Sequence, residues 1–316
     1  MAASVNLHSQ CPGVRQIQVV WSVLQENDDD HDKDIADRED EMPNNEIPQE
    51  VIDNPKVVIE KRTTNRLNNR FDIQPATPTA TLGIVILDDD LIYGCDALDM
   101  GFFLWAQNPD RMVTYAPRRH VVLDEQTQQW RYGVYKNNQF SLGLTSTAFL
   151  HRDYLYYYTH YLPRPIYQHI QDNMNCEDIA MSLFVSNLTD GKMPLAVDEW
   201  GIHGRQQLAL KTGYEGIKAG KNHGPHRSGC VDWYAIDLGL KDKFKQYETL
   251  YRLTTTNLDE TETKIVSNKR FLALEEKRKE WAKMTPDEFS KVVRKMQREL
   301  TQYAKKRNLT CEGHGR

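Results

Sequence analysis

Three consecutive carboxylates, Asp88–Asp90, follow directly after the most apolar stretch of the chain, Thr81–Leu87. That stretch predicts a strand suited to a sheet covered on both faces, and open α/β sheets bind ligands beyond the carboxyl ends of their strands. Crowded carboxylates repel and raise one another's pKa unless a cation neutralises them. Oxygen ligands suit Mg²⁺ or Mn²⁺, which would in turn hold a substrate diphosphate. We therefore favour a cation site at Asp88–Asp90 over a solvated acidic turn.

Two further groups of polar residues could contact such a substrate. Thr63–Phe71 combines Arg66 and Arg70 with three asparagines; arginine suits phosphate, and asparagine suits the edges of a base or ribose. Such polar stretches are also common at helix starts and in loops, so this signal alone is weak. Asn175–Asp178 opens a predicted helix, where acidic side chains satisfy the dipole and the free N–H groups. Taken alone, helix capping is the favoured interpretation of that group.

A third polar group, His223–Cys230, holds two histidines, an arginine and a cysteine. No His/Cys spacing there fits a zinc site, and the histidines are expected to be local hydrogen-bond partners rather than ligands. The five cysteines of the chain are too few for a disulfide scaffold and include no CxxC pair. The cysteine count therefore leaves the redox compartment open.

The elements that must position these residues alternate between strand and helix patterns without internal repeats, which predicts an α/β fold over roughly residues 15–240. Strands are expected at Gln16–Trp21, Lys56–Glu60, Thr81–Leu87 and Phe140–Phe149, and helices at Asp96–Trp105, with Asp96 as N-cap, and at Glu177–Leu188.

Charge divides the chain of 316 residues, whose net charge is −5, into unequal parts. Residues 1–14 form an N-terminal lead to the domain at 15–240. Within that domain, residues 26–50 carry twelve acidic and two basic side chains, and we expect a disordered insertion there. Residues 241–316 form a basic, mainly helical extension, in which Thr285–Glu288 is a capping box. We favour solvated helix faces over a nucleic-acid or membrane surface for that extension.

Taken in order, these segments resemble the exostosin-like glycosyltransferase domain, glycosyltransferase family 64. The match spans about residues 15–240, and the order and spacing of its motifs make it far more specific than the acidic triplet alone. The matching motifs are Val19–Trp21, Thr63–Phe71, Leu87–Asp90, Phe102–Trp105, Pro109–His120, Trp130–Tyr132, Asn175–Met181 and His226–Cys230.

The resemblance implies a GT-A fold, a Rossmann-like nucleotide-diphospho-sugar transferase with a mixed sheet flanked by helices, followed here by the helical extension. It also implies a role for each matching site residue. Asp88–Asp90 would hold the metal, with Asp90 as the direct ligand and Asp88 and Asp89 beside the sugar nucleotide. Asn65 and Arg70 would contact the nucleotide, and Asp178 and Arg227 would lie beside the anomeric carbon and the leaving diphosphate. Asn175 and Glu177 would line the donor and acceptor sugars, and Cys176 and Cys230 would form a disulfide.

The function implied is a Mn²⁺-dependent (or Mg²⁺-dependent), retaining transfer of a sugar, N-acetylhexosamine in typical members, from a UDP-sugar to a glycan, glycoprotein or glycolipid. The implied place is the Golgi or the ER, with the disulfide in an oxidising lumen. The chain has no run of about 18 apolar residues and no secretory h-region, so a membrane anchor is expected only in a longer form, and nucleic acid is not an expected partner.

Two departures from the family pattern support an alternative function. Family domains begin with a strand and helix ahead of the strand at Val19–Trp21, so we expect this chain to lack its first strand and to leave a sheet edge unpaired. The residue after that strand, usually Asn, is Ser22. The alternative is a catalytically inactive lumenal scaffold or binding domain.

Overall fold

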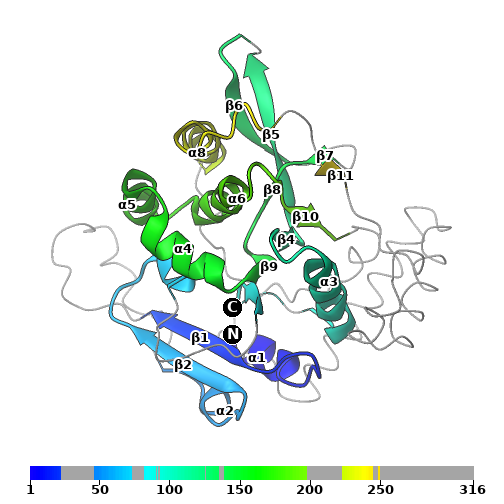
Figure 1. Ribbon diagram of the computed structural model, residues 1–316. Coiled ribbons are helices and arrows are strands. Elements are labelled where there is room, and N and C mark those ends of the chain that lie inside the picture. Colours follow the sequence, from blue (N-terminus) through cyan, green and yellow to red (C-terminus); the bar gives the residue numbers. More distant parts are fainter. Residues whose placement is uncertain are drawn as a thin grey trace, which may run out of the picture.

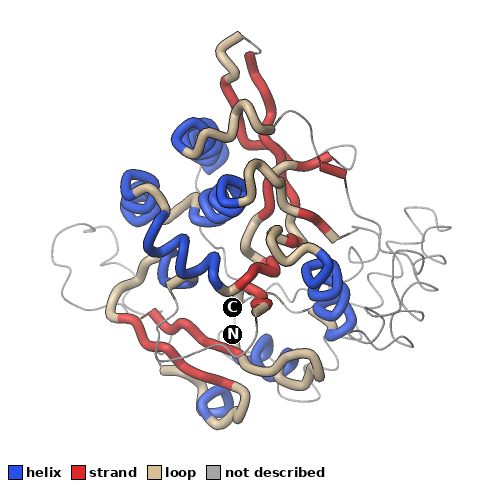
Figure 2. Tube along the Cα trace, in the orientation of Figure 1, coloured by secondary structure: helices blue, strands red, loops and turns tan. Residues whose placement is uncertain are grey.

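The computed structural model describes residues 1–22, 46–72, 82–89, 91, 93–124, 126–134, 139–197, 223–244 and 248–249. Strands run through the middle of this part of the molecule, with helices on both sides (Figure 1; Figure 2). The architecture is the mixed α/β type expected from the sequence.

The central sheet contains four strands in the order β10-β4-β9-β3. β3 (Gly83–Leu87) and β4 (Val113–Thr114) both pair antiparallel with β9 (Thr147–His151), while β10 (Leu195–Ala196) pairs parallel with β4. In this register Leu87 faces Thr147 across the ladder. The residue that follows β3, Asp88, is therefore fixed at the same end of the sheet as the start of β9.

Side chains of the central strands alternate between two hydrophobic clusters, as the period of two in a strand requires. Ala148 and Leu150 belong to the cluster on the side of α4 (Asp153–Tyr161), α5 (Arg164–Asn173), α6 (Glu177–Leu188) and α8 (His223–Asp237). Phe149, between them in sequence, belongs to the cluster formed with α3 (Cys95–Gln107). The sheet is thus covered by helices on both faces, and α6 and α8 lie side by side on one of them.

A second, parallel pair of strands is formed by β1 (Ile17–Ser22) and β2 (Val57–Arg62). Two short helices, α1 (Ala2–His8) and α2 (Gln49–Ile52), pack against this pair through a small core of Val5, Val19 and Val51. The 3₁₀ helix η2 (Leu67–Arg70) follows β2 and leads toward the central sheet. Among the described residues, β1 pairs only with β2 and β3 pairs only with β9.

The remaining strands form a three-stranded sheet and a short two-stranded one. The first has the order β6-β5-β8, and its β5–β6 hairpin projects from the top of the molecule in Figure 1. α8 packs against β6, which places α8 beside the hairpin. The strands are β5 (Pro117–Asp124), β6 (Gln129–Val134) and β8 (Leu142–Gly143), and the two-stranded sheet joins β7 (Gln139–Phe140) to β11 (Glu248–Thr249).

Two disulfides cross-link the chain. Cys176–Cys230 joins the start of α6 to α8, and the pairing that the family resemblance implied is confirmed. Cys11–Cys95 joins the segment after α1 to the first residue of α3, a pairing that the sequence did not predict. No helix among the described residues is both long enough and apolar enough to cross a bilayer.

Several sequence predictions are confirmed and three are corrected. β1, β2, β3 and α6 lie where they were expected. The single strand expected at Phe140–Phe149 is instead three short strands, β7, β8 and β9, which are separated by a bend at Ser141 and a turn at Thr145–Ser146. The helix α3 begins at Cys95 with Gly94 as its N-cap, so the assignment of Asp96 to that position was wrong. The side chains of β3 are all half-buried, so this strand is less covered than its apolar composition suggested.

The helix expected from Thr285 onward, and most of the acidic segment at 26–50, lie outside the described residues.

Candidate functional site

The start of α6 brings three polar side chains into the interior. Cys176 is the N-cap, with a left-handed backbone (φ 73°), and its disulfide to α8 fixes this turn. Glu177 and Asp178 are both buried in the first turn of the helix. Asn175 Oδ1 accepts the N–H of Cys176 at 2.8 Å, and Cys176 itself provides no side-chain cap. Helix capping therefore explains Asn175, but the two buried carboxylates have other partners.

Asp178 finds its partner in Arg227 on the neighbouring helix α8. The guanidinium donates two hydrogen bonds of 2.8 Å each, one to each carboxylate oxygen, and a third of 3.2 Å to Asn175 Oδ1. Only 6% of the Arg227 side chain and 11% of the Asp178 side chain is exposed. Such a bidentate pair is strong because both partners are charged and shielded from water. Burial lowers the pKa of Arg227, but the charge and hydrogen bonding of Asp178, together with Tyr132 and Glu177, outweigh burial, and the net shift is upward.

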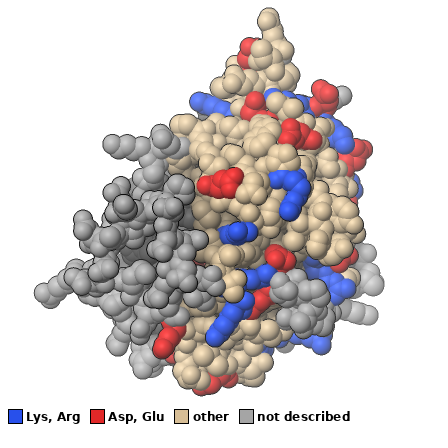
Figure 3. Space-filling view, turned by 90° about the vertical axis from the view of Figure 1, so that its left-hand side faces the viewer, with Lys and Arg blue, Asp and Glu red and all other residues tan. Residues whose placement is uncertain are grey.

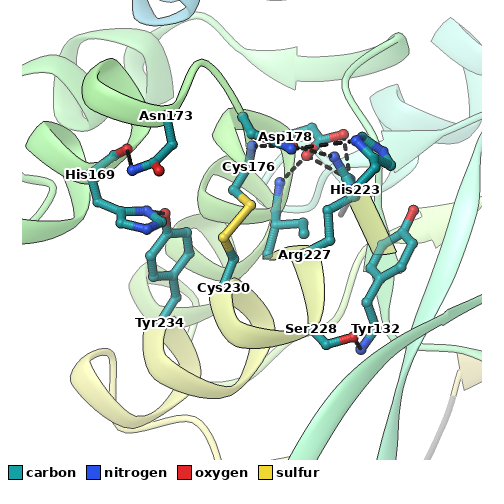
Figure 4. The surroundings of a disulfide bond; sticks show 12 residues. Tyr132, His169, Asn173, Cys176, Asp178, His223, Arg227, Ser228, Cys230 and Tyr234 are labelled. Carbon is teal, nitrogen blue, oxygen red and sulfur yellow. Dashed lines mark hydrogen bonds and ion pairs between the residues drawn. A yellow bond between two sulfur atoms is a disulfide. The ribbon is translucent and has the colours of Figure 1, made fainter. Parts of the chain in front are cut away.

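The aromatic ring of Tyr132, on β6, lies against the other side of Arg227. The guanidinium carbon is 4.6 Å from the ring centroid, a favourable cation–π distance. Arg118 Nε donates a 2.8 Å hydrogen bond to the hydroxyl of Tyr132, which holds the ring in place. Figure 4 shows Arg227 between Asp178 and Tyr132, with the disulfide next to it.

Glu177 contacts a second arginine, Arg70, which arrives from η2. Arg70 Nη1 lies 3.4 Å from Glu177 Oε1, and its Nη2 donates to Asp88 Oδ1 at 2.5 Å and to the carbonyl of Thr145 at 3.2 Å. Burial lowers the pKa of Arg70, and the charges of Asp88, Glu177 and Asp178 reverse that shift and raise it. Arg70 thus links the end of β3, the start of β9 and the start of α6.

Burial and the neighbouring charge of Asp178 together raise the pKa of Glu177 to about 7, although Arg70 and Arg227 oppose this shift. A carboxylate with such a pKa exchanges its proton near neutral pH, which is a property of groups that take part in acid–base chemistry and of some structural ion pairs.

Three polar atoms of this cluster are buried and have no hydrogen-bond partner among the residues that the structure describes. They are Nε of Arg70, Nε of Arg227 and Oγ1 of Thr145. Buried polar groups are normally paired, because an unpaired one costs about 1–3 kcal/mol. The cluster therefore retains buried donors that the described residues leave unpaired.

The acidic triplet is only partly placed. Asp88 follows β3 and is held by Arg70, while the side chain of Asp89 is 76% exposed and lies 3.9 Å from the N-terminal ammonium group. Asp90 lies outside the described residues. Carboxylate oxygens are the right donors for Mg²⁺ or Mn²⁺, so the two described residues fit such an ion chemically. Arg70 already supplies part of the positive charge that the sequence argument assigned to the metal.

A chain of hydrogen bonds ties α1 to the loop after β3. Tyr93 N–H donates to Nε2 of the buried His8 at 3.1 Å, which leaves the proton of the neutral ring on Nδ1, and Nδ1 lies 3.2 Å from the hydroxyl of Ser4. Ser4 in turn donates to the carbonyl of Leu91 at 3.0 Å. Together with Cys11–Cys95, these contacts attach the N-terminal segment to the acidic loop, and no sequence motif indicated them.

The asparagines of Thr63–Phe71 divide into different roles. Asn68 is buried and bonds to Tyr158 Oη and to the carbonyl of Tyr167, so it holds η2 against α4 and α5. Asn69 bonds to the hydroxyl of Ser22 and to the carbonyl of Thr64. Asn65 is exposed in the loop before η2. Of this stretch, the structure therefore brings Arg70 into the cluster with Asp88, Glu177, Asp178 and Arg227.

Two residues that the sequence analysis did not single out contact the cluster, namely Tyr132 and Thr145. Tyr132 belongs to a motif that was noted only as part of the family pattern, and Thr145 lies in the turn that was expected to be a strand. On the side of the molecule that lies to the left in Figure 1, charged side chains are scattered among uncharged ones rather than gathered in one basic area (Figure 3). That face gives no support to a nucleic-acid surface on the described residues.

Comparison with known proteins places this geometry in a family. Mouse exostosin-2 is 30% identical over 234 residues, which cover 73% of this chain and 29% of exostosin-2. The exostosin-like-3 homolog of Caenorhabditis elegans is 30% identical over 262 residues, which cover 81% of this chain and 28% of that protein. Glycosylinositol phosphorylceramide mannosyl transferase 1 of Arabidopsis thaliana is 28% identical over 244 residues, which cover 75% of this chain and 67% of the plant protein.

The chain thus spans less than a third of the length of the exostosins that it matches. The family model for the glycosyl transferase family 64 domain matches residues 1–249, which include every residue of the cluster described above. The chain belongs to glycosyl transferase family 64.

Proposed function

We propose that this chain is a metal-dependent, retaining glycosyltransferase that uses a UDP-sugar as donor and a glycan, glycoprotein or glycolipid as acceptor. The observation that carries the proposal is the convergence of two arginines and three carboxylates from η2, β3, α6 and α8, with buried donors left unpaired. Breaking a sugar–phosphate bond creates negative charge on the diphosphate and positive charge on the sugar. A site for this reaction needs fixed cations and fixed anions next to each other.

Arg227 is the group best suited to the leaving diphosphate. It is permanently charged, and guanidinium geometry matches phosphate oxygens. Its Nε is buried without a partner among the described residues, so an oxygen at that position would remove the cost of the unpaired donor. Asp178, which Arg227 holds in one orientation, would stabilise the positive sugar centre as the bond to the phosphate breaks.

The acidic triplet would hold a divalent ion, Mn²⁺ or Mg²⁺, through Asp88 and Asp90, with Asp89 beside the nucleotide. When bound there, such an ion stabilises the negative charge of a diphosphate. Arg70 keeps the Asp88 carboxylate oriented at the end of β3 and would also lie near the nucleotide, together with Asn65. Glu177 and Asn175 would line the donor and acceptor sugars, and the pKa of Glu177 near 7 suits a group that takes up a proton as the acceptor hydroxyl reacts.

The family typically uses UDP-N-acetylhexosamine, and we propose this donor class here. The plant relative, whose name specifies a mannosyl transferase that acts on glycosylinositol phosphorylceramide, shows that the donor and acceptor differ within the family. The Cys176–Cys230 disulfide fits an oxidising compartment, which supports a Golgi or ER location.

The direct test is release of UDP from a panel of UDP-sugars, with and without acceptor, in the presence of Mn²⁺. Arg227→Ala and Asp178→Asn should each reduce the rate by at least about 100-fold, as loss of a group that stabilises transition-state charge does. Asp172→Asn is the matched control, because this exposed carboxylate on α5 bonds only to Gln168 among the described contacts; it should retain the full rate. Equal rates for the Arg227 variant and the wild type would overturn the proposal.

A second candidate is a catalytically inactive lumenal binding or scaffold domain. It is favoured by one observation: Asp178 and Arg227 already neutralise each other through two short hydrogen bonds, so the pair can serve as a structural link between α6 and α8. Two results for the folded wild-type protein would together favour this candidate. It would release no UDP from any donor, and it would show no binding of UDP with Mn²⁺ by calorimetry.

A further inference from the structure

The Cys176–Cys230 disulfide separates two different groups of side chains. On one side lie Asp178 and Arg227, and on the other lie His169 and Tyr234, as Figure 4 shows. His226, one residue before Arg227 on α8, stacks on His169 of α5, with ring centroids 5.2 Å apart and planes inclined by 8°. The proposed transfer reaction uses neither histidine.

These histidines and the disulfide form a compact group of metal-ligand atoms. A ring nitrogen of His169, a ring nitrogen of His226 and Sγ of Cys230 all lie within 4.8 Å of one another. Both histidines are half-buried and Cys230 is buried. Two imidazoles and a thiolate are ligands that Zn²⁺ prefers.

The hydrogen bonds around the rings leave the appropriate nitrogens available. Nδ1 of His169 lies 2.8 Å from the hydroxyl of Tyr234. A ligating histidine usually has its other nitrogen held in this way, because the bond fixes the tautomer and the ring orientation. Nε2 of His226 is buried and has no hydrogen-bond partner among the described residues. A buried nitrogen without a partner costs free energy, and a metal ion at that position would remove the cost.

In the oxidised protein the third donor is occupied, because the sulfur of Cys230 is bonded to that of Cys176. A dithiol reductant changes this. The dithiol transfers two electrons and two protons to the disulfide, the bond between the two sulfurs breaks, two thiols form, and the dithiol closes to its own cyclic disulfide. Loss of the thiol proton of Cys230 to solvent then provides a thiolate next to the two histidines.

We propose that the reduced protein binds one Zn²⁺ ion through His169, His226 and Cys230, and that this metal-bound state and the Cys176–Cys230 disulfide exclude each other. Cys176, freed by the same step, is adjacent and can complete the four ligands of a tetrahedral site. The disulfide links α8 to α6, whereas the metal, through His169, would also link α8 to α5. Zn²⁺ would therefore hold α8 in place while the disulfide is open, and would compete with its closure.

Co²⁺ is a suitable probe, because a thiolate bound to Co²⁺ gives a charge-transfer absorption that Zn²⁺ abolishes by displacement. The full chain, reduced by a dithiol that is then removed without oxygen, should bind one Co²⁺ with this band, and the oxidised chain should not. His169→Asn and His226→Asn keep all cysteines. Each should weaken the binding of Co²⁺ by at least about 10-fold, because even changes to residues that only support metal ligands cost this much. His160→Asn, a histidine on α4 that contacts Tyr156, and Cys11→Ser, which opens the other disulfide, are matched controls that should keep the band.

A redox titration measures the same competition independently. At free Zn²⁺ concentrations that saturate the reduced protein, each tenfold increase in Zn²⁺ should raise the midpoint potential of this disulfide by about 30 mV, the value for a two-electron couple. In His226→Asn this dependence should begin only at free Zn²⁺ concentrations at least about 10-fold higher. If reduction itself unfolds the chain, Zn²⁺ added before the reductant must preserve the native circular dichroism spectrum. Reduced wild type without the band, histidine variants with wild-type affinity, a potential independent of Zn²⁺, or failure of Zn²⁺ to protect the reduced fold would each overturn the proposal.

Discussion

Glu177 and Asp178 are adjacent in the sequence, yet their carboxylates contact two different arginines from distant parts of the chain. Asp178 binds Arg227, 49 residues downstream, and Glu177 lies against Arg70, 107 residues upstream. The two side chains of one helical turn thus join η2 to α8, and Arg70 also contacts Asp88 at the end of β3. This single turn of α6 organises the cluster to which we assign the transfer reaction.

The Asp178–Arg227 pair allows stability and catalysis to be separated. Arg227→Ala alone should destabilise the fold by about 3–5 kcal/mol, because it leaves a buried carboxylate without its partner. The double variant Asp178→Asn/Arg227→Gln removes both charges together and should recover most of that stability. Denaturant unfolding measures the stability, and UDP release measures the catalysis. The double variant should remain inactive; a double variant that regains activity would show that the pair is structural only.

The raised pKa of Glu177 predicts a stability that depends on pH. Burial and the charge of Asp178 raise this pKa from its ordinary value of 4.5 to about 7, so between these values the folded state binds more protons than the unfolded state. Stability must then fall as pH rises from about 4.5 to about 7, by on the order of 2 kcal/mol for this group. Glu177→Gln should remove that fall. Unfolding curves from pH 4.5 to pH 8 for both proteins test this, and parallel pH profiles would contradict it.

Protonation of His8 at low pH should weaken the attachment of α1 to the loop that follows β3. Burial lowers the pKa of His8 to about 4, so this ring contributes stability above its unfolded pKa of about 6.5, and that stability is lost as pH falls from 6.5 through 4. A protonated Nε2 can no longer accept the N–H of Tyr93. The loss should approach about 3 kcal/mol at low pH.

His8→Gln is the informative variant, because glutamine can accept a hydrogen bond but does not titrate. It should be less sensitive to acid than the wild type, while still showing the contribution of His120, whose pKa is also lowered to about 4 by burial and by Arg119. Amide hydrogen exchange of residues 91–95 at pH 5 and pH 7 locates the effect. Because the intrinsic exchange rate of an amide itself depends on pH, protection factors are compared, and protection in this loop that does not change with pH would exclude the proposed link.

The sequence predicts the strands and the helix that carry the cluster, because their apolar patterns are strong. Residues 83–87 form an unbroken apolar run, and residues 177–188 hold enough apolar side chains to predict a helix, whereas β8 contains only two residues and gives no such signal. The pairings across the cluster could not be predicted from pattern alone. Nothing local to Arg70 indicates that its partners are Asp88 and Glu177, since these contacts depend on how η2, β3 and α6 pack together.

The two disulfides show the same limit. Cys176–Cys230 followed from the family resemblance, because both residues lie in recognisable motifs. Cys11 and Cys95 lie in segments without such motifs, and their proximity depends on the packing of α1 against the loop after β3.

The most direct measurement of the central claim is calorimetric titration of the full chain with UDP in the presence and absence of Mn²⁺. If the cluster of Arg70, Asp88, Glu177, Asp178 and Arg227 is a nucleotide-sugar site, UDP should bind in a Mn²⁺-dependent manner. Arg227→Ala should weaken this binding by at least about 10-fold, as loss of a charge-assisted contact worth 1.4 kcal/mol or more requires, and Asp172→Asn should leave it unchanged. Folded wild-type protein that takes up no UDP, or an Arg227 variant with undiminished affinity, would contradict the account.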